Sequence, residues 1–325
     1  MKRLLVLATL TVFVFGITNV IAQEAQDDAK VALYKRFVDN RGPHQDIAYQ
    51  AGKEYLEKYG KDKDKYTEYI EKWVNIYERE DRKQKLPILI NQGNFNEAFQ
   101  VGAKILEGEP DYLQARILLG YAGYLAMLKN DESHNGEALG YAKSAIESLE
   151  SGKMPKAPTT LPGDPKPDIW APFKSKDDTL AYLQFAKAVL SLKATPDDSI
   201  DALLKAVTYE SEIKKTPSTY YFLAAAYESG PYKPMSESYQ SLHANKPETP
   251  EGKVALEKLN AVMDRIIDAY ARAIALTGTD PKTEKARKEW LAQMTTYYKF
   301  RNAGSDAGMT ELINGSLQKP LPPKP

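Results

Sequence analysis

Residues 94–107 decide the fold class, and they read NFNEAFQVGAKILE. Apolar and small residues recur here at i, i+3, i+4 and i+7, a spacing that places them along one face of an α-helix. Pro110 follows, and proline cannot continue a helix because it has no backbone N–H. The pattern predicts a helix that buries one stripe, formed by Phe95, Ala98, Phe99, Gly102, Ile105 and Leu106.

The same period continues on either side of this stretch. Residues 111–128 place a broad apolar face on a second predicted helix, and the short connector indicates antiparallel neighbours. Most of the remaining sequence is rich in Ala, Leu, Lys, Glu and Gln, which are good helix formers. We find no run of alternating β-branched residues, so the sequence predicts an all-α fold.

Short internal repeats accompany the helical pattern. Residues 48–57 read AYQAGKEYLE and residues 98–107 read AFQVGAKILE, and a third copy begins at Ala138. The copies share small residues at equivalent helical positions, which allow two helix backbones to approach closely. Because such a helix cannot bury its face alone, we expect neighbouring helices to stack on it.

The repeated pattern resembles the tetratricopeptide (TPR) repeat, a 34-residue helix–turn–helix unit. When family positions are assigned to residues 93–110 and counted on without a gap, Leu119 and Gly120 fall at positions 7 and 8 of the next unit. Similar matches recur around Tyr220, Ala269 and Trp290, so the resemblance covers residues 44–302. The matches that begin the pattern, at family positions 15, 17, 20, 24, 27 and 32, are Gly93, Phe95, Ala98, Gly102, Ile105 and Pro110.

This resemblance implies an all-α, TPR-like α-solenoid of antiparallel helix pairs, with about ten to twelve helices. The repeats are degenerate, because extra residues separate some of the helices. The first helical hairpin departs from the family, since residues 84–92 contain Pro87, and we expect a short helix or a kink there.

Proline placement and the N-terminal sequence suggest the organisation of the chain. Residues 1–22 have a basic start and a short apolar run, as in a cleaved signal peptide, so we expect a periplasmic or extracellular protein. An N-terminal segment with a first helix (23–43) and the repeat domain (44–304) follow. Proline-rich inserts are expected at 151–177 and 229–250, followed at 305–325 by a C-terminal tail that is proline-rich at its end. From Gln318 onward (QKPLPPKP) this tail should be extended and mobile.

Composition excludes several classes of function. Without Lys2 and Arg3 the chain has 42 basic and 44 acidic residues, so it has no long-range attraction for DNA, RNA or anionic lipid. It contains no cysteine, which excludes disulfides, thiolate metal sites and a lipoprotein anchor. No later stretch is apolar enough for a membrane span. No phosphate-binding or nucleophile motif occurs, and the three histidines lie in polar turns where we expect them to be exposed. We therefore predict no catalytic residue, cofactor or metal.

The TPR resemblance also implies a ligand-facing groove on the first helix of each pair. Twenty-one tyrosines are present, and several fall at these positions. Packing against a neighbouring helix is the alternative role for them, and the sequence leaves both open. The family clamp for chaperone carboxylates is not assembled, because its positions hold Ile117 and Leu183. The partner-binding residues that we predict are Gln114, Tyr121, Tyr124, Lys187, Tyr221, Glu228 and Trp170.

The function expected from this resemblance is an exported, non-catalytic scaffold that binds a peptide segment or partner protein in its groove. The alternative is a helical glycan-binding protein of the cell envelope, with Trp170, Phe173 and surface tyrosines as stacking platforms. A hydrolase within the inserts is a third possibility, supported only by their length. For Trp170 and Phe173 we favour a structural role, in which both rings cover an end of the apolar seam.

Overall fold

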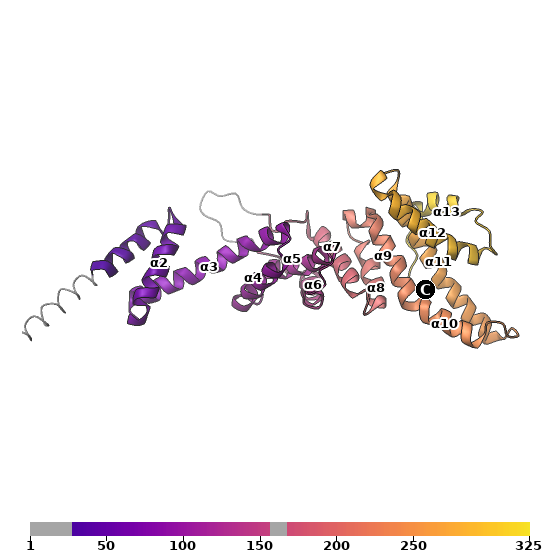
Figure 1. Ribbon diagram of the computed structural model, residues 1–325, viewed down its shortest axis with the longest axis horizontal. Helices are drawn as coiled ribbons and strands as arrows, with labels where there is room; N and C mark the ends of the chain where they lie inside the picture. Colours follow the sequence, from indigo (N-terminus) through magenta and orange to yellow (C-terminus); the bar gives the residue numbers. More distant parts are fainter. Residues whose placement is uncertain (1–27, 157–167) are drawn as a thin grey trace, which may run out of the picture. The chain divides into compact units, whose positions relative to one another are not determined.

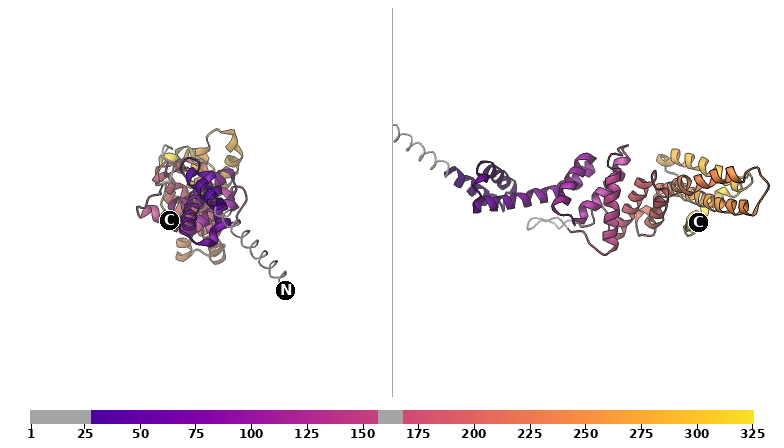
Figure 2. Two further views of the ribbon diagram at one scale, coloured as in Figure 1. Left: turned by 90° about the vertical axis from the view of Figure 1, so that its left-hand side faces the viewer. Right: turned by 90° about the horizontal axis from the view of Figure 1, so that it is seen from below.

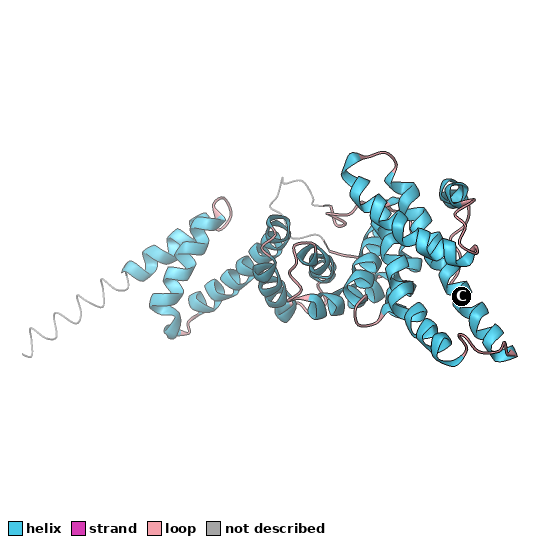
Figure 3. Cartoon of the chain, turned by 45° about the vertical axis from the view of Figure 1, so that its right-hand side comes forward, coloured by secondary structure: helices cyan, strands magenta, loops and turns pink. Residues whose placement is uncertain are grey.

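The computed structural model describes residues 28–156 and 168–325, and these ranges contain helices, turns and loops but no strand (Figure 3). The predicted signal peptide and the middle of the insert 151–177 lie outside the described residues. A helical segment over residues 28–40 precedes twelve α-helices, which keep the labels of Figure 1. Their bounds are α2 Gln45–Tyr59, α3 Lys65–Gln92, α4 Phe95–Gly108, α5 Leu113–Met127, α6 Asn135–Glu150, α7 Lys176–Ser191, α8 Pro196–Ala206, α9 Pro217–Tyr227, α10 Lys233–Leu242, α11 Pro250–Thr277, α12 Glu284–Arg301 and α13 Met309–Gly315. The prediction of an all-α fold with about ten to twelve helices is confirmed.

The described chain forms two compact units, residues 28–82 and residues 83–325. Helix α3 contributes residues 65–82 to the first unit and residues 83–92 to the second. We expected a short helix or a kink at 84–92, and the first of these alternatives is wrong, because these residues continue α3 through Pro87. Proline in a helix removes one backbone hydrogen bond, and packing of the neighbouring Leu86, Leu89 and Ile90 into the core offsets this loss.

In the first unit, α2 packs on α3 around an aromatic core. Phe37 and Tyr55 are fully buried there together with Ile70 and Val74. Gly52, from the first repeat copy, permits the close contact: a Cβ atom added to it would lie 3.0 Å from the Val74 side chain. The small residue at this repeat position therefore serves helix packing, as its spacing predicted.

A single carboxylate fixes the start of α3 in this unit. Asp64 Oδ1 accepts hydrogen bonds from the backbone N–H groups of Tyr66 (3.0 Å) and Thr67 (2.8 Å). Asp64 Oδ2 accepts a third, at 2.7 Å, from the Lys30 ammonium in the preceding helical segment. The Lys30 contact and the N–H bonds lower the pKa of Asp64 to about 2, so this N-terminal cap stays ionised.

In the second unit, helices pack mainly on their neighbours in chain order. Helix α4 contacts α5, and the contacts continue from α5 to α6, α6 to α7, α7 to α8 and α8 to α9. Helix α11 then packs on both α9 and α12, while α10 lies beside α11, within the insert expected at 229–250. The right-hand view of Figure 2 shows the helices of this unit succeeding one another. Sequential antiparallel-like packing of this kind is that of a helical repeat array.

Small residues allow these helices to approach closely. A Cβ atom on Gly120 of α5 would lie only 2.8 Å from both the Cα and N atoms of Ala142 on α6. Between α7 and α8, the Ser199 hydroxyl donates to the Ala188 carbonyl at 2.8 Å. Ala142 belongs to the third repeat copy, so here too the repeat places a small residue at a helix contact.

The tail contains α13 and a 3₁₀ turn over Ser316–Gln318, and from Lys319 onward it has no regular secondary structure but is docked against the second unit. Buried Arg272 of α11 donates from Nη2 to the carbonyls of Lys319 and Pro320, both at 3.0 Å. Leu321 packs against the core, and Lys324 forms an ion pair with Asp201 of α8 at 3.1 Å. The expectation of a mobile end is therefore wrong for these residues.

Candidate functional site

The candidate site is an apolar cavity of about 420 Å³ in the second unit. Its walls come from the last turns of α3, from α5 and from the loop at 168–172. The aliphatic part consists mainly of Leu86, Ile90, Leu118 and Leu125. Two predicted partner-binding residues, Gln114 and Tyr121, also line this cavity. Such a volume accommodates one large side chain with adjoining backbone.

Gln114 presents an unused hydrogen-bond acceptor in this region. Its Nε2 atom donates to the Ala171 carbonyl at 2.9 Å, which fixes the orientation of the amide. Its Oε1 atom is buried and has no hydrogen-bond partner among the residues that the structure describes. Buried side-chain oxygens normally have a partner, so this unpaired acceptor is unusual for a residue in the cavity wall.

Tyr121 forms the aromatic side of the cavity. Its ring makes edge-to-face contacts with Phe173 (5.3 Å between centroids) and with Tyr182 of α7 (5.5 Å). Burial is the main cause that raises the pKa of Tyr121 to about 12. The phenol is therefore neutral at physiological pH and acts as an apolar surface with one polar end.

A chain of ring contacts connects this region to the far helices of the unit. Tyr124 of α5 contacts Phe185 of α7 at 5.1 Å, and Phe185 contacts Phe222 of α9 at 5.8 Å. Tyr221, next to Phe222, stacks on Trp290 of α12 at 5.2 Å with an interplanar angle of 17°. Three predicted partner-binding residues, Tyr121, Tyr124 and Tyr221, therefore belong to one line of aromatic contacts. Most of the rings in this line are only partly buried.

Glu228 lies near the α12 end of this chain of rings. It is half-buried and begins a π-helical turn over Glu228–Tyr232 that follows α9. Its Oε1 atom accepts a hydrogen bond of 3.1 Å from the Tyr270 hydroxyl. Burial, the dominant cause, raises the pKa of the Glu228 carboxyl.

Of the seven predicted partner-binding residues, only Gln114 and Tyr121 line the cavity, and Trp170 and Lys187 are among the five that do not. Trp170 packs against a core cluster together with Phe173, whose side chain is only 5% exposed. This is the structural role that we favoured for the two rings. Lys187 is half-buried on α7 and does not line the cavity.

Two of the three histidines depart from the expectation of full exposure. His134 stacks on Phe99 with centroids 4.1 Å apart, and its Nε2 atom lies 2.7 Å from Asn96 Oδ1. His243 is half-buried beside Gly252. Their polar turn sequences did not reveal that tertiary contacts would cover the rings.

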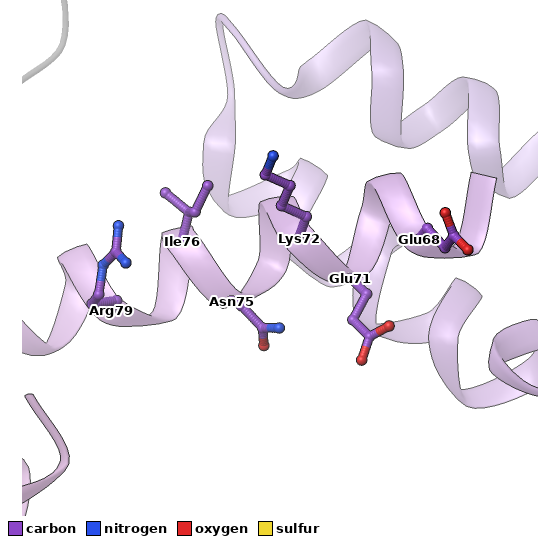
Figure 4. Close-up of a pocket in the computed structure, with 6 residues that line it drawn as sticks. All are labelled: Glu68, Glu71, Lys72, Asn75, Ile76 and Arg79. Atoms are coloured by element: carbon purple, nitrogen blue, oxygen red, sulfur yellow. The ribbon is translucent and has the colours of Figure 1, made fainter. Parts of the chain in front are cut away.

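A second hollow lies along α3 in the first unit (Figure 4). All the residues that line it belong to this one helix, and four of them carry charges. A solvated helix face explains such a surface. Its lining residues are Glu68, Glu71, Lys72, Asn75, Ile76 and Arg79.

The described ranges contain neither a membrane-spanning helix nor a metal-binding cluster. No helix in them is long and apolar enough to cross a membrane. No group of three or more acidic or histidine side chains gathers there in a metal-binding arrangement.

The acidic turn that begins at Asp131 is stabilised by its own side chains. Asp131 Oδ1 accepts a hydrogen bond of 2.6 Å from the Ser133 hydroxyl.

Comparison with known proteins identifies no family for this chain. No family model, curated protein or solved structure matches this chain. The structure therefore supports a helical array packed in sequential pairs, and the TPR relationship stays a hypothesis.

Several residues of the site were missed by sequence reasoning. Leu86 and Ile90 belong to the part of α3 where the proline had suggested an interruption, and Ala171 lies in an insert. Tyr270 and Tyr297 come from helices distant in sequence from Glu228. Their aromatic and aliphatic character was visible, but no sequence spacing showed that they meet.

Proposed function

We propose that this chain is an exported, non-catalytic, TPR-like scaffold that binds an extended peptide segment of a partner protein. The observation that carries the proposal is Gln114 Oε1, which has no partner among the described residues and belongs to a residue of the cavity wall. An extended peptide presents alternating backbone N–H groups and side chains, so it can donate to this oxygen while one side chain enters the cavity.

The energetics favour an apolar anchor residue in the peptide. Burying a leucine-sized or phenylalanine-sized side chain against the cavity contributes about 1.5–3 kcal/mol. The Gln114 amide is already oriented by Ala171, and Tyr121 is fixed between aromatic neighbours, so the receptor orders few side chains on binding. This preorganisation supports recognition by a preformed groove.

Export and the absence of catalysis belong to the same proposal. The apolar run within residues 1–22 is the basis for export to the periplasm or the cell exterior. The raised pKa of Tyr121 keeps its phenol protonated, which suits a contact residue better than a nucleophile or a general base. The glycan-binding alternative required Phe173 as an exposed stacking surface, but this side chain is buried.

Substitutions at the cavity test this function. Peptides selected from a random display library against residues 23–325 should bind at least about tenfold more weakly to Tyr121→Ala, because a hot-spot aromatic contributes about 2 kcal/mol. Gln114→Leu should also weaken binding, because the peptide N–H then loses its acceptor. Isothermal titration calorimetry measures both changes.

A matched substitution separates the site from general surface effects. Tyr141 on α6 is also half-buried but does not line the cavity, so Tyr141→Ala should change the affinity less than about twofold. Circular dichroism checks that all variants remain folded. Equal losses for Tyr121→Ala and Tyr141→Ala would refute the assignment of the cavity as the peptide site.

A further inference from the structure

Glu228 is a half-buried carboxylate with no cationic partner among the described residues. It accepts a hydrogen bond of 3.1 Å from the Tyr270 hydroxyl. By contrast, half-buried Asp268 pairs with Arg272 at 2.7 Å, and Glu78 pairs with Arg82 at 3.1 Å. A half-buried carboxylate carries a desolvation cost that a neutral donor offsets only in part.

Aromatic rings connect with Glu228 through Tyr270, which donates to it and whose ring centroid lies 6.5 Å from that of Tyr221. Tyr221 and Trp290 form a stacked pair, and Tyr232 meets Tyr297 edge to face at 5.2 Å. These four rings are only partly buried. Ring faces attract cations, and planar guanidinium groups stack on tryptophan and tyrosine.

The carboxylate also retains unused acceptor capacity. An ionised carboxylate offers about four lone-pair positions, and the hydrogen bond from the Tyr270 hydroxyl uses one of them. The π-helical turn that begins at Glu228 is a further indication, since such turns are frequent at functional sites. A guanidinium group matches the remaining acceptors better than an ammonium group because it donates in a planar fork.

We propose that Glu228, with the rings of Tyr221 and Trp290, binds an arginine side chain of the partner peptide. This inference rests on the proposed function and names a second anchor of the peptide besides the apolar residue in the cavity. The negative carboxylate supplies the charge complement and the rings supply a stacking surface. Arginine at one position of the ligand then determines specificity.

A fluorescence titration tests the site without any peptide. The chain has three tryptophans, so Trp73→Phe combined with Trp170→Phe leaves Trp290 as the only reporter. Methylguanidinium chloride should produce a saturable change, while neutral methylurea and equal concentrations of NaCl should not. Methylammonium should bind more weakly than methylguanidinium.

The isosteric substitution Glu228→Gln should weaken methylguanidinium binding by about tenfold, because it removes the charge and keeps an acceptor for Tyr270. Glu289→Gln is the matched control, since this exposed carboxylate is next to Trp290 in sequence and should leave binding unchanged. No saturable signal, equal binding by Glu228→Gln, or tighter binding of methylammonium would overturn the proposal.

The library-selected peptides distinguish this inference from the function on which it rests. Enrichment of arginine at one position, lost when Glu228→Gln is the target, is the expected result. Peptides that depend on Gln114 and Tyr121 but show no arginine preference would refute the inference alone. Methylguanidinium binding at Glu228 without any peptide binding would refute the proposed function alone.

Discussion

Replacing Arg272 by methionine is expected to lower the free energy of unfolding by about 3 kcal/mol or more. The Arg272 side chain is 4% exposed, and its guanidinium binds Asp268 at 2.7 Å and two carbonyls of the tail at 3.0 Å. The substitution leaves Asp268 without its cation and both carbonyls without their donor. Removal of one partner of a buried ion pair typically costs about 3–5 kcal/mol. Thermal unfolding followed by circular dichroism measures the change.

Arg265 provides the matched control on the same helix. Its Nε atom donates to the Pro323 carbonyl at 2.6 Å, but the contact is exposed. Arg265→Met should therefore cost only about 0.5–1.5 kcal/mol, the net value of one ordinary hydrogen bond. Deletion of residues 319–325 should lower the free energy of unfolding by an amount between the losses for Arg272→Met and Arg265→Met. A deletion without effect on stability would show that the tail does not dock as described.

Gly120→Ala is expected to destabilise the second unit by about 2 kcal/mol, although alanine is the better helix former. The new Cβ atom would lie 2.8 Å from backbone atoms of Ala142, and backbone cannot move aside as a flexible side chain can. Overpacking of this kind costs about 1–3 kcal/mol. Since about 2–4 °C corresponds to 1 kcal/mol in a domain of this size, the melting temperature should fall by several degrees.

Replacing Gly140 by alanine should have the opposite effect on the free energy of unfolding and raise it. Gly140 lies exposed in α6, with open space where a Cβ atom would be added. Gly140→Ala should therefore stabilise the protein by about 0.5–1 kcal/mol through helix propensity alone. If both alanine variants were stabilised, the close contact between α5 and α6 would be contradicted.

The helical architecture could be predicted because it depends on local periodicity. The predicted stripe from Phe95 to Leu106 became the buried face of α4, and only its last residue, Leu106, is half-buried. The repeated small residues predicted close helix contacts, and Gly52 and Ala142 make them. A residue that must be small for packing is visible in a repeat because each copy meets the same steric demand.

Features that depend on contacts between distant segments could not be predicted. Pro87 suggested an interruption, but the tertiary packing of α3 allows its helix to continue. The tail had the composition of a mobile segment, yet buried Arg272 holds it from 47 residues away in sequence. In the candidate site, the position of Gln114 and Tyr121 on a predicted helix was enough to select them. The aliphatic walls from α3 and the tyrosine that donates to Glu228 come from other helices, and no sequence pattern showed these contacts.

The structure of the mature chain bound to a library-selected peptide tests the central claim most directly. We predict that a peptide backbone N–H lies within hydrogen-bonding distance of Gln114 Oε1, about 2.7–3.2 Å, and that an apolar peptide side chain fills the adjoining cavity. A complex in which Gln114 Oε1 stays unpaired and the peptide occupies another surface would contradict it.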